Sequence, residues 1–145
     1  MAIQLARLSD GALGNVIRFV ESWSDDDAYD RFGLFGRQTP QMLLRDLANN
    51  PKRRALLAFG DGRLIGLLDY VTEFAVVHFG IVVGAQYRRR RIGTALVGSL
   101  LKIKRPEWPV AAECRPDNRA ANTLLRVCGF ERIASERDGI LWRHS

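Results

Sequence analysis

The chain has 145 residues, of which 47% are hydrophobic and 26% are charged, and its formal net charge is +6 at pH 7. These values are typical of a globular protein with a real core, so we expect one domain over residues 1–145. The longest apolar run, residues 74–85, is interrupted by His78 and is too short to span a bilayer. We therefore expect no membrane segment and no targeting segment. The positive charge favours anionic partners without choosing among nucleotides, nucleic acid and acidic lipid.

The two cysteines, Cys114 and Cys128, form no Cys-x-x-Cys pair, and neither has a histidine at metal-ligand spacing. Such cysteines fit a reducing compartment, where they serve as small buried apolar residues. We therefore expect a cytoplasmic protein with no metal site.

The first elements expected along the chain are a strand over residues 3–7 and a helix capped by Ser9 and Asp10. The side chains expected on the buried face of this helix are Val16, Ile17 and Val20, with Trp23 as a further candidate.

An acidic cluster follows, made of Asp25, Asp26, Asp27 and Asp30. It could attract a cationic amine such as a lysine or a polyamine. It could also be structural, because Ser24 is a good N-cap and aspartates favour the first turn of a helix. The structural interpretation is favoured, and the other stays open.

The middle of the chain predicts a helix followed by three strands. Thr39-Pro40 is typical of a helix start, because Thr caps well and Pro belongs at the first helical position. Strands over residues 55–59 and 64–71 flank the tight-turn sequence at 60–62. A third strand over residues 74–83 is hydrophobic enough to be central.

Four consecutive arginines, residues 88–91, connect that third strand to an amphipathic helix. The free N–H groups and the dipole of a helix N-terminus favour phosphate, and the arginines add charge-assisted hydrogen bonds. Gly93 would let a ligand approach the backbone closely. A solvated basic face or a nucleic-acid patch is the alternative, but the position between a buried strand and a helix favours a phosphate site.

The C-terminal part predicts a strand over residues 110–114, a helix capped by Asp117 and Asn118 that ends at Gly129, and a closing hairpin around Asp138-Gly139. The resulting order is β-α-α-α-β-β-β-α-β-α-β-β. It predicts an α/β (α+β) protein with a mixed sheet and helices on both faces.

Three passages resemble the GCN5-related N-acetyltransferase (GNAT) superfamily, as found in bacteria. The first is the Gln/Arg-x-x-Gly-x-Gly/Ala signature, which begins at Arg88 and ends at Gly93. The second is an Asn-headed helix from Asn118 that ends in Gly129-Phe130. The third and weakest is the Arg-Phe segment at residues 29–32. The resemblance implies the GNAT fold, a mixed and mostly antiparallel sheet of six to seven strands. It also implies direct transfer of an acetyl group from acetyl-CoA to an amine.

The same resemblance implies which residues hold acetyl-CoA. The strand residues Ile81, Val82 and Val83 would pair with the pantetheine arm and supply an oxyanion donor. The residues implied around the pyrophosphate are Arg88, Arg89, Arg90, Arg91, Ile92, Gly93 and Thr94. Asn118 is either a cofactor contact or a plain helix cap.

Two positions depart from the family pattern. Arg91 stands where the signature has its first glycine, and Leu125 stands where many members carry a tyrosine acid. These departures leave open an alternative, a CoA-binding regulatory or interaction module without turnover.

Transfer to an amine needs a base, and the family places one near the start of the central strand. His78 matches that position and Glu73 lies five residues earlier, so both are candidates. His78 could equally be a hydrogen-bonded sheet residue, and Glu73 a solvated loop residue. The expected partners are acetyl-CoA and an amine acceptor, without nucleic acid or membrane. A homodimer is one assembly that stays open.

Overall fold

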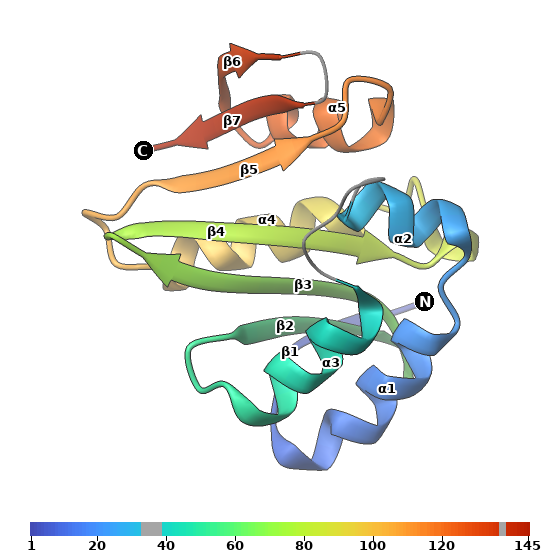
Figure 1. The fold of residues 1–145 in the computed structure, drawn as a ribbon. Coiled ribbons are helices and arrows are strands. Elements are labelled where there is room, and N and C mark those ends of the chain that lie inside the picture. The colour runs from blue at the N-terminus through green and yellow to red at the C-terminus, as the bar shows by residue number, and fades with distance from the viewer. Residues whose placement is uncertain (33–38, 137–138) are drawn as a thin grey trace.

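The computed structural model describes residues 1–32, 39–136 and 139–145, which form one mixed sheet with helices on both faces (Figure 1). The described residues form seven strands in the spatial order β1-β2-β3-β4-β5-β7-β6. Their bounds are β1 (Ile3–Arg7), β2 (Arg54–Gly60), β3 (Arg63–Glu73), β4 (Val76–Val83), β5 (Val110–Cys114), β6 (Glu131–Ser135) and β7 (Ile140–His144). All neighbouring strands are antiparallel except β4 and β5, which are parallel.

The helices within the described ranges are α1 (Leu13–Glu21), α2 (Asp25–Phe32), α3 (Pro40–Asn49), α4 (Ile92–Ile103) and α5 (Arg119–Val127). Two short 3-10 turns, η1 (Asp10–Ala12) and η2 (Ala85–Tyr87), precede α1 and α4. This order and the mixed, mostly antiparallel sheet confirm the fold expected from the sequence.

The sheet separates two hydrophobic clusters. On one face α1 and α3 pack through Val16 and Leu43 against Leu67 of β3. On the other face α4 and α5 pack through Leu96 and Leu125 against neighbouring strands. Alternate strand residues face opposite sides of a sheet, so each central strand contributes to both clusters.

The expected buried face of α1 was partly wrong. Ile17 is 37% exposed, whereas Phe19 is buried with Val16 and Val20. The apolar residues of this helix allow two overlapping stripes, and contact with the sheet selects the one with three- and four-residue spacing. Ser9 makes no side-chain cap bond, because a 3-10 turn rather than the helix follows it.

The turn between β3 and β4 also differs from expectation. Phe74 was expected inside the strand, but Phe74 and Ala75 form the turn with φ of 52° and 60°, and the Phe74 side chain is fully exposed. Glu73 pairs with Val76 across it. Two left-handed central residues are typical of a tight hairpin, but glycine or asparagine normally marks them, and this sequence has neither. The other tight turn, at Asp61 and Gly62, was expected.

The predicted helix caps are present at α2 and α3. The Thr39 hydroxyl accepts from the Met42 N–H at 3.2 Å, and the Ser24 hydroxyl accepts from the Asp27 N–H at 3.1 Å. No helix of the described residues is long and apolar enough to cross a membrane. β6 and β7 pair as expected, although Asp138 of the predicted turn lies outside the described residues.

β4 and β5 pair over a short stretch only. Their ladder joins Val77 to Val110 and His78 to Ala111, while β4 continues to Val83. The rest of β4 therefore leaves an edge that its parallel neighbour does not cover. This separation creates the cleft described below.

Candidate functional site

Two adjoining cavities lie along the uncovered half of β4. The outer cavity has a volume of about 730 Å³ and lies between the end of β4, the start of α4, and α5. The inner cavity has a volume of about 60 Å³ and lies between Gly80 on β4 and Cys114 on β5. Ile81, Leu124 and Asn118 line both, so the two are continuous in the fold. The outer volume is typical of a small-molecule site.

The hydrogen bonds at the two ends of β4 show which of its backbone groups face the cleft. The Val77 N–H donates to the Pro109 carbonyl at 2.9 Å, on the β5 side, and the Gly84 N–H donates to the Ile65 carbonyl at 2.8 Å, on the β3 side. Backbone polar groups alternate along a strand, so Ile81 and Val83 present theirs to the cleft. Val82 presents its backbone to β3 instead.

The basic turn between β4 and α4 contains left-handed backbone at two arginines. Arg89 and Arg91 have φ of 64° and 61°, and Arg91 is the N-cap of α4 without a side-chain cap bond. The first N–H groups of α4 are therefore left to an external acceptor. Glycine is favoured where the backbone is left-handed, which explains why a glycine suits the signature position that Arg91 occupies here.

The arginine side chains of this turn point in different directions. Arg88, Arg89 and Arg91 line the outer cavity. Arg90 is not among its lining residues, and its guanidinium instead lies 5.8 Å from the ring centre of Tyr87. The structure thus brings the other predicted cofactor residues together and leaves Arg90 at the rim.

Gly93 has a packing role beside its place in the cavity lining. A Cβ atom there would lie 3.1 Å from Cδ2 of Leu124 on α5. Glycine therefore permits α4 and α5 to approach closely where they form the outer cavity.

Asn118 is a helix cap, which is one of the two roles that the sequence left open. Its Oδ1 accepts from the Ala121 N–H at 3.2 Å, so it caps α5. It also lines both cavities. The cap does not exclude a ligand contact, because the amide NH2 of Asn118 remains a donor.

Helix α2 bridges the two walls of the cleft. Asp27 pairs with Arg88 of the basic turn at 2.5 Å, and Asp30 pairs with Arg115, after β5, at 3.1 Å. The Arg115 guanidinium also lies 3.3 Å from the ring centre of Tyr29. Burial is the main cause that raises the pKa of Asp30, and the Arg115 charge opposes it. The acidic cluster is therefore partly a set of helix tethers, beyond the capping expected from the sequence.

The inner cavity holds a small group of titratable side chains: Asp30, Arg31, Glu113 and Cys114. Burial raises the pKa of the Cys114 thiol to about 11, with further increases from the charges of Glu113 and Asp30. The thiol is therefore protonated at neutral pH. Glu113 was not among the residues expected at the site, although it is a lone charged residue in a short apolar strand.

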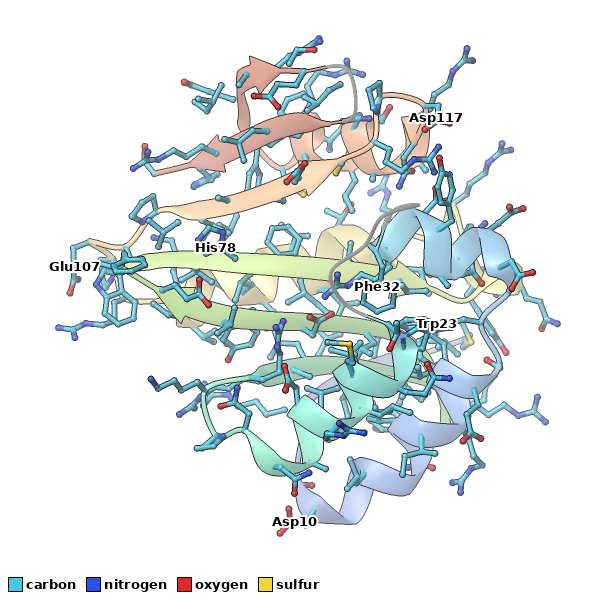
Figure 2. All side chains as sticks on the ribbon, viewed as in Figure 1. Asp10, Trp23, Phe32, His78, Glu107 and Asp117 are labelled. Carbon is cyan, nitrogen blue, oxygen red and sulfur yellow. The ribbon has the colours of Figure 1, made fainter. Side chains whose placement is uncertain are left out.

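Neither predicted base lines either cavity. His78 pairs with Val71 and Ala111 in the sheet, and Figure 2 shows it on the part of β4 nearer Glu107, away from Asp117. Glu73 is the last residue of β3, beside the exposed turn at Phe74. In the described ranges no cluster of His, Cys, Asp or Glu could hold a metal ion.

Comparison with known proteins gives a family match. The sequence model of the acetyltransferase (GNAT) family matches residues 17–130 of the chain. No relative was found among curated proteins.

Solved structures give matches over the whole chain. The GNAT domain of PAT from S. lividans has a TM-score of 0.84 at 18% identity, covering 98% of this chain and 89% of that one. The ribosomal-protein-S18-alanine N-acetyltransferase from Escherichia coli has a TM-score of 0.74 at 16% identity, covering 98% and 92%. The PaiA N-acetyltransferase from Thermoplasma acidophilum, solved with coenzyme A, has a TM-score of 0.74 at 15% identity, covering 99% and 98%. At these identities the likeness is one of fold.

Proposed function

Because the chain belongs to the acetyltransferase (GNAT) family, we propose that it transfers an acetyl group from acetyl-CoA to an amine by direct transfer. The observation that carries the proposal is the cleft of about 730 Å³ at the end of β4. It joins an uncovered strand edge to an uncapped helix N-terminus flanked by arginines. Coenzyme A needs both features, because it has an amide-bearing arm and a pyrophosphate.

The residues of the cleft divide into two groups by what they can bind. The N–H groups at the start of α4, with Arg88, Arg89 and Arg91, are suited to the pyrophosphate. The β4 backbone at Ile81 and Val83 is suited to the amide groups of the pantetheine arm, while Val82 contributes to the lining. The thioester supplies an activated acyl group.

The protonated state of the Cys114 thiol favours direct transfer over a covalent acyl-enzyme intermediate. Only a thiolate is an effective nucleophile, and the pKa of this thiol is raised to about 11. Cys114 is thus neutral at physiological pH, although it lines the inner cavity. The amine must then attack the thioester itself.

The amine proton needs an acceptor, and we place this role on Glu113. Glu113 is among the residues that line the inner cavity, whereas the sequence-based candidates His78 and Glu73 are not. The three variants Glu113→Gln, His78→Gln and Glu73→Gln separate the candidates. We expect the first to lower kcat about 100-fold and the others to change it less than threefold. A large loss in His78→Gln alone would return the role to the histidine.

Binding is tested by thermal unfolding with and without acetyl-CoA. We expect acetyl-CoA to raise the Tm of the protein, since a ligand stabilises the state that binds it. Gly93→Glu should abolish the effect, because it adds bulk against Leu124 and a negative charge beside the pyrophosphate site. Absence of any shift with acetyl-CoA, CoA or longer acyl-CoAs would remove the basis of the proposal.

A CoA-binding module without turnover is the second candidate, and Leu125 favours it. This buried side chain lies in α5 beside the inner cavity, so no hydroxyl is available there to protonate a leaving thiolate. Release of CoA thiol with a panel of amines and peptides distinguishes the two. Binding without thiol release on any acceptor would support the module.

The proposal also includes the cellular compartment and the oligomeric state of the protein. Cys114 and Cys128 are both free thiols, which supports the cytoplasm as the compartment. Light scattering of the purified protein would show whether it forms the homodimer left open above.

A further inference from the structure

Asp69 on β3 is the most buried charged group among the described residues, and two arginines share it. Its side chain is 1% exposed. Arg31 of α2 binds it through Nε at 3.0 Å and through Nη2, and Arg53 binds it through Nη1 at 3.0 Å. Arg53 also lies 3.7 Å from Asp46. Asp69 therefore faces two guanidinium groups, and Asp46 approaches only that of Arg53.

The two arginines differ in what else they contact. Arg31 lines the inner cavity beside the uncovered edge of β4, whereas Arg53 lines a separate cavity formed by the ends of β1 and α3. Asp69 can therefore hold the Arg31 guanidinium at the cleft, while its other partner, Arg53, lies outside the cleft.

Gly80 is what allows Arg31 to reach this position. A Cβ atom on Gly80 would lie 2.1 Å from Nε and 2.3 Å from Cζ of Arg31. Gly80 also pairs directly with Asp69 across β3 and β4. The Arg31 side chain therefore lies against the strand at Gly80, next to Ile81, whose backbone faces the cleft. Figure 1 shows α2 lying over part of β4.

Acyl transfer develops negative charge on the carbonyl oxygen of the thioester, which a cation such as Arg31 can stabilise. The amine lone pair forms the new C–N bond, and the carbonyl π electrons move to the acyl oxygen. The C=O bond re-forms as the C–S bond breaks, sulfur leaves as thiolate, and the amine proton goes to Glu113. A fixed cation beside the acyl oxygen stabilises the negative charge in between, and it does so strongly in a partly buried site.

We propose that Arg31 is a further catalytic residue, which stabilises the negative acyl oxygen together with the backbone of β4. Asp69 and Gly80 are its positioning residues. This inference rests on the proposed acetyl transfer. It also assigns a role to the Arg-Phe segment of α2, which the cofactor site leaves unexplained.

The first test compares Arg31→Gln with Arg53→Gln. Each variant removes one positive charge and one partner of the same carboxylate, but only the first alters the cleft. We expect Arg31→Gln to lower kcat at least about tenfold with KM for acetyl-CoA within about twofold, and Arg53→Gln to keep kcat within about threefold. Equal losses of kcat in the two variants would show a purely structural role for Asp69 and its partners, and would overturn the proposal.

Two more variants address the case in which Arg31→Gln unfolds. Arg31→Lys keeps the charge and should retain more activity than Arg31→Gln. Gly80→Ala keeps every charge but displaces the guanidinium, so it should lower kcat as Arg31→Gln does. A folded Gly80→Ala protein with wild-type kcat would contradict the proposal.

A binding measurement tests the same idea without turnover. S-carboxymethyl-CoA carries a negatively charged carboxylate one atom beyond the position of the thioester carbonyl carbon, and it cannot transfer an acyl group. By calorimetry, the ratio of its affinity to that of CoA should fall at least about fivefold in Arg31→Gln and stay constant in Arg53→Gln. An unchanged ratio in both variants would overturn the role of Arg31 but would leave the proposed acetyl transfer intact. Wild-type protein that binds neither compound would overturn the proposed function as well.

Discussion

At the scale of single residues, the most informative position is Arg91. It adopts a left-handed backbone at the N-cap of α4, which costs a non-glycine residue about 1–2 kcal/mol. The first N–H groups of the same helix have no side-chain cap, and in our proposal they bind the pyrophosphate. Strain that persists beside a binding cleft is typical of functional sites.

Arg91→Gly should therefore relieve strain. Glycine also makes the unfolded chain more flexible, and this extra entropy lowers the free energy of unfolding by about 0.5–1 kcal/mol. The net stabilisation is therefore smaller than the strain that is relieved. Arg90→Gly removes the same charge at a residue without positive φ. This variant has the same entropic cost on folding, but it relieves no backbone strain. We expect Arg91→Gly to be about 1 kcal/mol more stable than Arg90→Gly in urea unfolding. A less stable Arg91→Gly would mean that the arginine side chain contributes more than the strain costs.

Cys114 gives a pH-dependent prediction. Its thiol pKa rises from 9.0 to about 11 on folding, so the unfolded chain loses this proton at a lower pH than the folded one. The contribution to stability is complete below pH 9 and disappears as pH rises through 11. The wild type should thus lose on the order of 2 kcal/mol more than Cys114→Ala between pH 8.5 and 11. Parallel pH profiles of the two unfolding free energies would refute it.

At the scale of elements, α2 is held by three ion pairs to three different parts of the fold. Asp27 binds the basic turn, Asp30 binds Arg115 after β5, and Arg31 binds Asp69 of β3. Asp27, Asp30 and Arg88 line the outer cavity, whereas Arg115 does not. A phosphate in that cavity must compete with Asp27 for Arg88.

Asp27→Asn should therefore tighten acetyl-CoA binding by about two- to fivefold, as expected for release of a partly exposed ion pair. Amide hydrogens of α2 should exchange faster in the free variant, because one tether is lost. Asp26→Asn is the control, since it removes the same charge from the neighbouring residue on the same helix. Weaker binding in Asp27→Asn would instead mean that Asp27 holds Arg88 in its ligand-binding position.

The start of α5 combines stability and binding in Asn118. Asn118→Ala should lower the free energy of unfolding by about 1 kcal/mol, because it removes the cap on the Ala121 N–H. Asn118→Asp keeps a good cap but puts a negative charge into the outer cavity. It should keep the stability of the wild type and weaken CoA binding. Unchanged CoA affinity in both variants, measured by calorimetry, would leave Asn118 as a cap only.

At the scale of the whole molecule, family membership and the seven-stranded sheet confirm the expected fold and the expected class of acyltransferase. The order of elements was readable because its signals are local. Gly60 to Gly62 mark one hairpin, Thr39-Pro40 marks a helix start, and the β-branched residues of β4 mark a central strand. The Phe74 turn was not readable, since its residues carry no turn signal.

The candidate site was only half predictable for the same reason. The residues that bind the cofactor in our proposal follow one another along the chain, from Ile81 to Thr94, and therefore form one local pattern. Glu113, Asp30 and Arg31 come from three distant segments, and only the inner cavity brings them together. Sequence spacing pointed to His78 as the base, but spacing does not reveal where β4 and β5 separate.

By itself, the sequence determined the element order, the basic turn before α4 and the family, because each depends on neighbouring residues and their backbone preferences. Only the tertiary structure decided which side chains line the inner cavity. That depends on where the β4–β5 ladder ends and on the buried pairing of Arg31 with Asp69, which lie 38 residues apart. It also showed that the backbone at Arg91 is left-handed, a conformation that depends on the whole turn and that explains why a glycine suits this position.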